Sequence, residues 1–266
     1  MKTATGVVLS AALALTALSW ARAQSETTSA ATARTQPRTD DRNDLSPQEI
    51  VRRFAAKESE FYEAWKQYTY RQTAEVRVLS VNGMPKREAM TTISDIVFKD
   101  DGTREVRVLR RASNLRSIVY TMQDEEVIDN LHPFALTEKE LPLYDLKYAG
   151  KEKVDELSCH VFSVSPKSLK GGKLYFEGKI WVDDQDLQVV RTLGKAVPQK
   201  KDNQFPEFET IRQVIDKQYW FPVWTHAESQ LRFQRDTIHI EETVTYEGYK
   251  RFGSKATIQF EPAKPK

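Results

Sequence analysis

Four histidines and a single cysteine are the residues best suited to metal binding or nucleophilic catalysis. They are His132, His160, His226, His239 and Cys159. Two imidazoles usually reach one metal ion when they are spaced as His-x-His or His-x-x-x-His, and no such pair occurs. His226 and His239 could face each other across a hairpin, but an exposed cross-strand pair is the simpler interpretation. A single cysteine also excludes an internal disulfide framework and a cysteine-built metal site. The sequence therefore predicts no metal and no cofactor.

Other motifs that could indicate catalysis or ligand binding have simpler structural explanations. The chain contains no Gly-x-Ser-x-Gly elbow, so a serine esterase of the common α/β type would lack its nucleophile turn. Residues 183–186, Asp-Asp-Gln-Asp, lack the glycine and distal glutamate of a helix-loop-helix calcium site and favour a polar turn. Gly171-Gly172 also fits a turn, and Cys159 lies in an apolar strand context where a thiol is normally inert. We expect a protein that is not an enzyme.

Composition and charge narrow the function classes further. The 266 residues are 39% apolar and 29% charged, which is enough to bury one core and is unlike a disordered or polytopic membrane chain. Lys and Arg total 40 against 38 Asp and Glu, and the net charge of +2 falls to zero without the N-terminal Lys2 and Arg22. A neutral chain gives no electrostatic reason to expect nucleic acid as a partner.

The N-terminal residues have the pattern of a cleavable secretory leader. Lys2 precedes an apolar run over residues 7–18, and Ala21-Arg22-Ala23 follows with the small residues that a signal peptidase accepts. The run is short for the ~20 residues that cross a bilayer, although an uncleaved anchor is the alternative. We predict a signal peptide over residues 1–23 and a mature chain that is soluble in the periplasm or outside the cell.

The rest of the chain is predicted to form a linker, one domain and a tail. Residues 24–45 are rich in Ser, Thr, Ala and charged side chains and contain little to bury, so a flexible linker is expected. The domain is expected over residues 46–262, and a short tail over residues 263–266.

A capping pattern and an apolar stripe predict an N-terminal helix that begins at Pro47 and ends near Tyr68. Ser46 can cap this helix, Pro47 suits its first position, and Glu49 can reach back to the cap amide. Apolar side chains then recur on one face, at Ile50, Phe54, Phe61, Trp65 and Tyr68. The charged residues Arg52, Arg53, Lys57, Glu58 and Glu60 fall outside this stripe. One face of the helix must therefore cover another part of the protein.

After Tyr68 the apolar period changes to two and predicts roughly ten strands. They are expected near residues 70–80, 87–98, 104–108, 144–154, 159–165, 173–183, 187–193, 208–216, 219–233 and 237–249. Asn82-Gly83 and Asp101-Gly102 have the chemistry of tight hairpin turns. A weaker helical signal over residues 121–131 has Thr121 as its cap and acidic residues in its first turn.

The strands alternate between apolar and polar side chains, which favours an antiparallel sheet with one solvated face. In residues 173–183, for example, Phe176 and Ile180 share a face opposite Glu177 and Trp181. Strands of this length favour a bent sheet over an immunoglobulin-like sandwich. We predict an α+β, mostly β fold: a strongly curved antiparallel sheet that forms an incomplete β-barrel, with the N-terminal amphipathic helix and a second short helix as its lid.

The order of these elements and four short segments resemble the periplasmic lipoprotein-carrier (LolA-like) superfamily, which includes lipoprotein localisation factors and related envelope-stress sensors. The segments are Tyr148-Ala149-Gly150, Cys159-His160-Val161-Phe162-Ser163-Val164, Ile180-Trp181-Val182-Asp183 and Tyr219-Trp220-Phe221-Pro222. The resemblance covers roughly residues 47–260. It implies an incomplete β-barrel whose apolar concave face is closed by helices and holds lipid acyl chains.

The alternation independently predicts an apolar groove under a removable helix, because a curved sheet leaves a concavity that its own side chains do not fill. The predicted groove and lid residues are Ile50, Phe54, Phe61, Trp65, Leu174, Phe176, Ile180, Val182, Phe221, Val223, Leu231, Phe233, Ile240, Val244 and Tyr246. Such a groove predicts a periplasmic carrier of lipids or acylated lipoproteins, with a membrane-bound donor or acceptor protein as a further partner. We expect the N-terminal helix to move off the sheet for loading.

The alternative is an envelope sensor, a regulatory interaction protein of the same fold with no transport role. It predicts a filled groove and an external patch for a protein partner. Trp220 and Trp224 lie four residues apart on one strand and could form this patch, although a covered position is favoured. Pro222 lies between them and predicts an edge strand or a bulge.

Overall fold

The computed structural model describes residues 45–99, 101–201, 204–215, 217–233 and 236–251. All of them belong to one unit of the chain, residues 44–266. The predicted signal peptide, the predicted tail and all but the last residue of the predicted linker lie outside the described residues. Within the described residues, no helix is long and apolar enough to cross a membrane.

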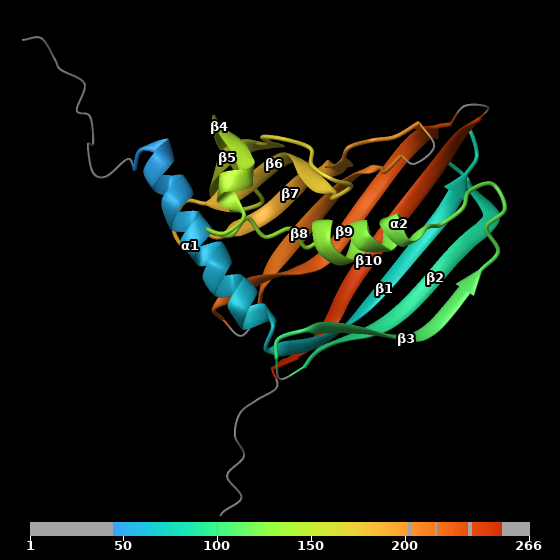
Figure 1. Ribbon diagram of the computed structural model, residues 1–266, viewed down its shortest axis with the longest axis horizontal. Coiled ribbons are helices and arrows are strands. Elements are labelled where there is room, and N and C mark those ends of the chain that lie inside the picture. The colour runs from blue at the N-terminus through green and yellow to red at the C-terminus, as the bar shows by residue number, and fades with distance from the viewer. Residues whose placement is uncertain (1–44, 100, 202–203, 216, 234–235, 252–266) are drawn as a thin grey trace, which may run out of the picture. The chain divides into compact units, whose positions relative to one another are not determined.

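The described residues form four helices or helical turns and one antiparallel sheet (Figure 1). The helical elements are α1 (Pro47–Trp65), α2 (Met122–Glu126) with the π-helical turn η1 (Val127–Leu131), and the 3₁₀ turn η2 (Leu141–Leu143). The strands are β1 (Tyr68–Leu79), β2 (Pro85–Phe98), β3 (Arg104–Ser113), β4 (Tyr144–Val154), β5 (Leu157–Pro166), β6 (Tyr175–Asp183), β7 (Val189–Val197), β8 (Glu207–Ile215), β9 (Tyr219–Arg232) and β10 (Thr237–Arg251).

The sheet is open rather than closed into a barrel. Its ten strands have the order β3-β2-β1-β10-β9-β8-β7-β6-β5-β4, so β3 and β4 are edges at opposite ends. Figure 1 shows the sheet curving around α1 and α2, which lie on the same face. The predicted fold class, a curved antiparallel sheet with a helical lid, is confirmed.

The local signals at the element ends explain where these elements begin. Ser46 accepts a hydrogen bond from the backbone of Glu49 (3.2 Å), and Thr121 caps α2 in a reciprocal capping box with Asp124. Gly83 and Gly102 adopt positive φ angles of 76° and 78° in the hairpins that join β1, β2 and β3. One detail of the prediction is wrong: the Glu49 carboxylate does not return to the cap but binds the two arginines at positions 52 and 53.

Most of the buried apolar side chains lie on the concave face in two clusters. One lies under the first half of α1 and includes Phe54, Phe162 and Phe176. The other lies under the second half of α1 and includes Phe61 and Phe221. A third, smaller cluster contains Cys159, Val161, Trp181 and Val190. Because Trp181 alternates with Ile180 and Val182, this third cluster lies on the outer face, and the expectation that only one face is dry is wrong at β6.

Pro222 marks a bulge in β9, as predicted, but not a sheet edge. Ile211 of β8 lies opposite Trp224, whereas the next residue, Arg212, lies opposite Pro222. The extra residue on β9 is Val223, and β9 pairs with strands on both sides. The missing amide of Pro222 is therefore tolerated at a break in the ladder rather than at an edge.

Candidate functional site: cavities on the concave face

The predicted groove residues fall into a packed part and an open part. The packed part lies in the two concave clusters and contains Ile50, Phe54, Phe61, Trp65, Leu174, Phe176, Ile180, Val182, Phe221, Val244 and Tyr246. The open part contains Leu231, Phe233 and Ile240, which line a cavity. Two residues of the packed part, Trp65 and Leu174, also line a separate cavity of about 410 Å³. Val223 is half-buried at the β9 bulge and belongs to neither part.

The concavity near β6 is filled by side chains of the segment that follows η1. The ring of Phe134 stacks on Phe176 with 4.4 Å between ring centroids, and Tyr144 packs against Phe134 edge to face. Phe176 has no exposed surface. A substitution such as Phe176→Asp would therefore test the core rather than a ligand site.

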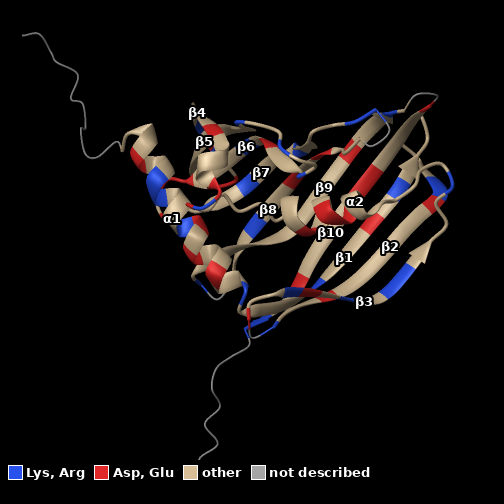
Figure 2. Cartoon of the chain, in the orientation of Figure 1, with Lys and Arg blue, Asp and Glu red and all other residues tan. Residues whose placement is uncertain are grey.

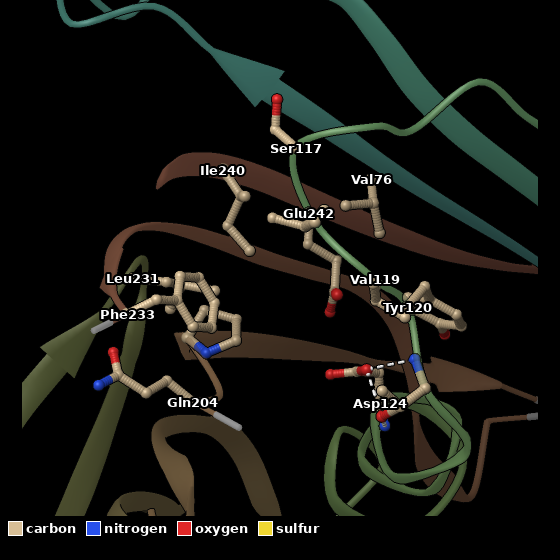
Figure 3. Close-up of a pocket in the computed structure, with 13 residues that line it drawn as sticks. Val76, Ser117, Val119, Tyr120, Asp124, Gln204, Leu231, Phe233, Ile240 and Glu242 are labelled. Carbon is tan, nitrogen blue, oxygen red and sulfur yellow. Dashed lines mark hydrogen bonds between the residues drawn. The ribbon is translucent and has the colours of Figure 1, made fainter. Parts of the chain in front are cut away.

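The first cavity lies on the concave face between β1, β9, β10 and the segment before α2, and has a volume of about 290 Å³ (Figure 3). It is lined by Val76, Ser117, Ile118, Val119, Tyr120, Thr121, Asp124, Gln204, Pro206, Leu231, Phe233, Ile240 and Glu242. Figure 3 shows Leu231, Phe233 and Ile240 on one side of this cavity and the carboxyl groups of Glu242 and Asp124 on the other. The cavity thus has an apolar wall and an acidic wall.

A second cavity of about 200 Å³ lies farther along the same strand. It is lined by Gln72, Ala74, Thr92, Ser94, Val106, Val108, Arg111, Tyr120, Glu125, Ile128 and Asp129. Gln72, Ala74 and Val76 are successive concave-face residues of β1, and Tyr120 lines both cavities. The segment that contains Tyr120 therefore separates two hollows that follow one strand.

We call residues 114–126, which include this separating segment and α2, the lid segment. None of the α2 residues is buried, and Val119 and Met122 are each 86% exposed. Its start is fixed to β2 by Glu88, whose carboxylate accepts from the backbone of Arg116 (2.8 Å) and Ser117 (2.7 Å). A segment that buries so little apolar surface can open at low cost in free energy.

The Glu88→Gln variant is expected to loosen the lid segment. Hydrogen bonds from Ser117 and from the backbone of Arg116 hold the pKa of Glu88 below its usual range. Removing the charge of Glu88 weakens these hydrogen bonds. Amide hydrogen exchange over residues 114–126 should quicken roughly tenfold. Glu105→Gln, which removes a half-buried carboxylate paired with Arg107 on β3, is the control and should leave this exchange unchanged. Equal exchange in both variants would show that Glu88 does not hold the lid segment.

Glu242 of the acidic wall is a buried polar group that the strand alternation did not single out, and His132 lies beside it. Glu242 is 6% exposed and His132 is fully buried, and Nε2 of His132 lies 3.2 Å from Oε1 of Glu242 without the alignment of a hydrogen bond. Burial raises the pKa of Glu242 to about 8, with a smaller contribution from the Asp124 carboxylate, and burial lowers the pKa of His132 to about 3. Both side chains are therefore mostly neutral at pH 7.

Helix α1 is fixed to the sheet by a buried ion pair. The guanidinium of Arg212 donates from Nη1 to Oε1 of Glu58 (2.9 Å) and from Nη2 to Oε2 (3.1 Å), and both side chains are 1% exposed. Arg212 also donates to the carbonyl oxygens of Phe134 and Val189. The expectation that Glu58 falls outside the apolar stripe of α1 is thus wrong. Moving α1 off the sheet would break this pair.

The remaining candidates for chemistry have structural roles. His239 lies opposite Gln230 and His226 opposite Thr243, so these two histidines do not face each other. Asp183 accepts hydrogen bonds from the backbone of Gln185 and Asp186, as the turn interpretation predicts. The described residues contain no group of three or more His, Cys, Asp or Glu side chains that could hold a metal ion.

Cys159 and the two candidate surface tryptophans are also accounted for by packing. Cys159 is fully buried, and this burial raises the pKa of its thiol to about 11. Trp220 packs against the outer-face cluster and donates to Asp186 (2.9 Å), and Trp224 stacks on His226. Both tryptophans are half-buried, so they do not form an open patch for a partner.

No family model matches this chain. No curated protein matches it either. Solved structures of similar fold include a DUF1329 family protein from Desulfovibrio piger, which is 15% identical with a TM-score of 0.43 over 82% of this chain and 96% of its own. A LolA superfamily protein from Nitrosomonas europaea is 9% identical with a TM-score of 0.35 over 79% and 94%. An outer membrane lipoprotein-sorting protein domain from Vibrio parahaemolyticus is 8% identical with a TM-score of 0.35 over 79% and 95%.

These three solved structures are similar to the chain in fold. With identities of 15% and below, this similarity concerns the fold.

Proposed function

We propose that the protein is a periplasmic binding protein that carries lipids or acylated lipoproteins and holds their acyl chains in the concave-face cavities. The observation that carries this proposal is the pair of cavities along β1, which are separated by a lid segment with no buried residue in α2. The periplasmic location rests on the predicted signal peptide. The expectation that the protein is not an enzyme stays a prediction.

The size of the cavities supports a chain-like guest. Sites for small molecules have volumes of about 300–1,000 Å³, so the first cavity alone, at about 290 Å³, suits a short aliphatic chain. Displacing the lid segment would join it to the second cavity. Each methylene removed from water contributes about 0.8 kcal/mol, so eight of them would contribute roughly 6 kcal/mol before the costs of association. This free energy allows both capture and release.

Charge patterning supports an opening at the lid segment rather than at α1. Figure 2 shows acidic residues on α2 and basic residues on β3, and Glu125 forms an ion pair with Arg111 at 2.7 Å. Both partners are about 40% exposed, so this contact is worth little in free energy. By contrast, breaking the buried pair under α1 would cost several kcal/mol. We therefore propose that α1 stays in place during loading.

Native mass spectrometry tests the proposal with a variant that fills the first cavity. Gently purified protein should carry an added lipid mass, and Val76→Trp should remove it because the indole occupies the space of the ligand. Glu75→Trp is the matched control, because its side chain lies on the other face of β1, and it should keep the lipid. Circular dichroism checks that both variants fold. Repeated preparations of folded wild-type protein without any added mass would favour the alternative, a sensor with no transport role.

A further inference from the structure

The described side chains that line the first cavity include acidic groups and no basic group. Among the described residues that line it, Asp124 and Glu242 are the only ionisable groups apart from the phenol of Tyr120, and none is Lys, Arg or His. Acidic residues lie on both α2 and β10 (Figure 2). An anionic ligand would therefore meet two carboxyl groups and no compensating positive charge.

Glu242 is directed into this cavity and has an unused oxygen. Its side chain is more than nine-tenths buried, it points into the cavity in Figure 3, and Oε1 makes no hydrogen bond. Nε2 of His132 lies 3.2 Å from this oxygen, and burial keeps that imidazole neutral. A buried carboxyl group without a donor is costly in free energy, so a ligand that supplies a donor would gain from it.

Asp124 presents a second carboxylate to the same space. Its Oδ2 accepts from the backbone nitrogen and the hydroxyl of Thr121, both at 2.6 Å. These bonds use one of its two oxygens. Burial also raises the pKa of Asp124, so this carboxylate too would be stabilised by a nearby cation.

We propose that the first cavity selects its guests by charge: it binds an aliphatic chain that ends in a primary ammonium group and rejects the same chain ending in a carboxylate. The ammonium lies between Glu242 and Asp124, and the chain lies along Leu231, Phe233 and Ile240. This inference rests on the proposed function, because it names the chemical class of the polar end of the guest.

Binding of the ammonium group is linked to a proton. The groups that face Glu242 are His132 after η1, Tyr120 and Asp124 of the lid segment, and Tyr246 on its own strand. None of them is cationic at pH 7. Because Glu242 is mostly protonated at pH 7, an ammonium ion favours its ionised form and binding releases a proton. Affinity for the ammonium should therefore rise between pH 6 and 8.

Titration calorimetry with three twelve-carbon probes tests the inference on the full mature chain. The probes are dodecylammonium, dodecanol and dodecanoate, each kept below its aggregation concentration. Dodecylammonium should bind at least tenfold more tightly than dodecanoate, and measurements in two buffers of different ionisation enthalpy should show proton release at pH 7. Glu242→Gln should reduce the affinity for dodecylammonium at least tenfold and leave that for dodecanol unchanged. Glu241→Gln, the neighbouring outward-facing glutamate, should change neither.

The outcomes separate the inference from the proposed function. Charge selection is overturned if dodecanol binds and dodecanoate binds as tightly as dodecylammonium. It is also overturned if Glu242→Gln leaves the ratio of the affinities for dodecylammonium and dodecanoate unchanged. In both cases the site for the aliphatic chain remains. If none of the three probes binds the folded protein, the proposed function is overturned as well. Asp124→Asn provides a second test should Glu242→Gln fail to fold, and it should reduce the preference for the ammonium in the same direction.

Discussion

The Arg212→Met variant is expected to lose about 3–5 kcal/mol of unfolding free energy, because it leaves the Glu58 carboxylate buried without its partner. Oε1 and Oε2 of Glu58 accept from Arg212 at 2.9 and 3.1 Å, and both side chains are excluded from water. The carbonyl of Phe134 loses a donor in the same variant. Urea unfolding of the mature chain, followed by circular dichroism, measures the loss.

The double variant Glu58→Met with Arg212→Met is the matched control. It removes both charges and fills their volume with apolar side chains, so its stability should lie within about 1–2 kcal/mol of the wild type. A loss below about 1 kcal/mol in the single variant would contradict the role of this pair in fixing α1. Equal losses in the single and double variants would indicate that the contact of the Arg212 guanidinium with the Phe61 ring, rather than the ion pair with Glu58, stabilises the protein.

The pH dependence of stability is the second large effect. Glu242 has a pKa of about 8 in the folded chain against an ordinary value of 4.5, so the stability associated with its protonation is lost as the pH rises through 8. His132 has a folded pKa of about 3 against 6.5, so its contribution is lost as the pH falls toward 3. From pH 4.5 to 6.5 the two slopes oppose each other. Between pH 6.5 and 8, ionisation of Glu242 in the unfolded chain but not in the folded chain should lower stability by about 1.4 kcal/mol per pH unit.

The Glu242→Gln variant separates the contribution of Glu242 to the pH dependence of stability from the contributions of the other titrating groups. The glutamine keeps the shape of the side chain and has no proton to lose, so the stability of the variant relative to the wild type should increase from pH 6.5 to 8. The measurement is urea unfolding of both proteins at several pH values. A constant difference across this range would mean that the Glu242 carboxyl group has an ordinary pKa in the folded chain.

Local patterns in the sequence were sufficient to predict most of the fold. The caps at Ser46 and Thr121 and the hairpin glycines depend on neighbouring residues, and the structure confirms each of them. The alternation along the strands holds less strictly, because both faces of β6 are buried. The burial of Glu58 could also have been predicted from the sequence. The predicted stripe on α1 skips from Phe54 to Phe61, and Glu58 occupies the intervening position on the same face.

Part of the acidic wall could also have been predicted from the sequence. Glu242 has the same strand parity as Ile240 and Val244, both of which were assigned to the concave face. Alternation does not reveal which distant segment covers a given strand, however. Phe134 fills the hollow at Phe176, whereas the lid segment leaves space beside Ile240, and both segments reach the sheet through contacts distant in sequence. For this reason the open part of the groove could not be distinguished from the packed part.

The location of a bound chain tests the proposed binding site most directly. A crystal structure of the mature chain with 12-bromododecan-1-ol would mark the end of the chain by the anomalous signal of bromine. We predict density for the chain between Val76, Leu231 and Ile240, with the lid segment displaced or reordered around it. A ligand bound only outside the two concave-face cavities, or cavities that remain empty at saturating ligand, would contradict the proposal.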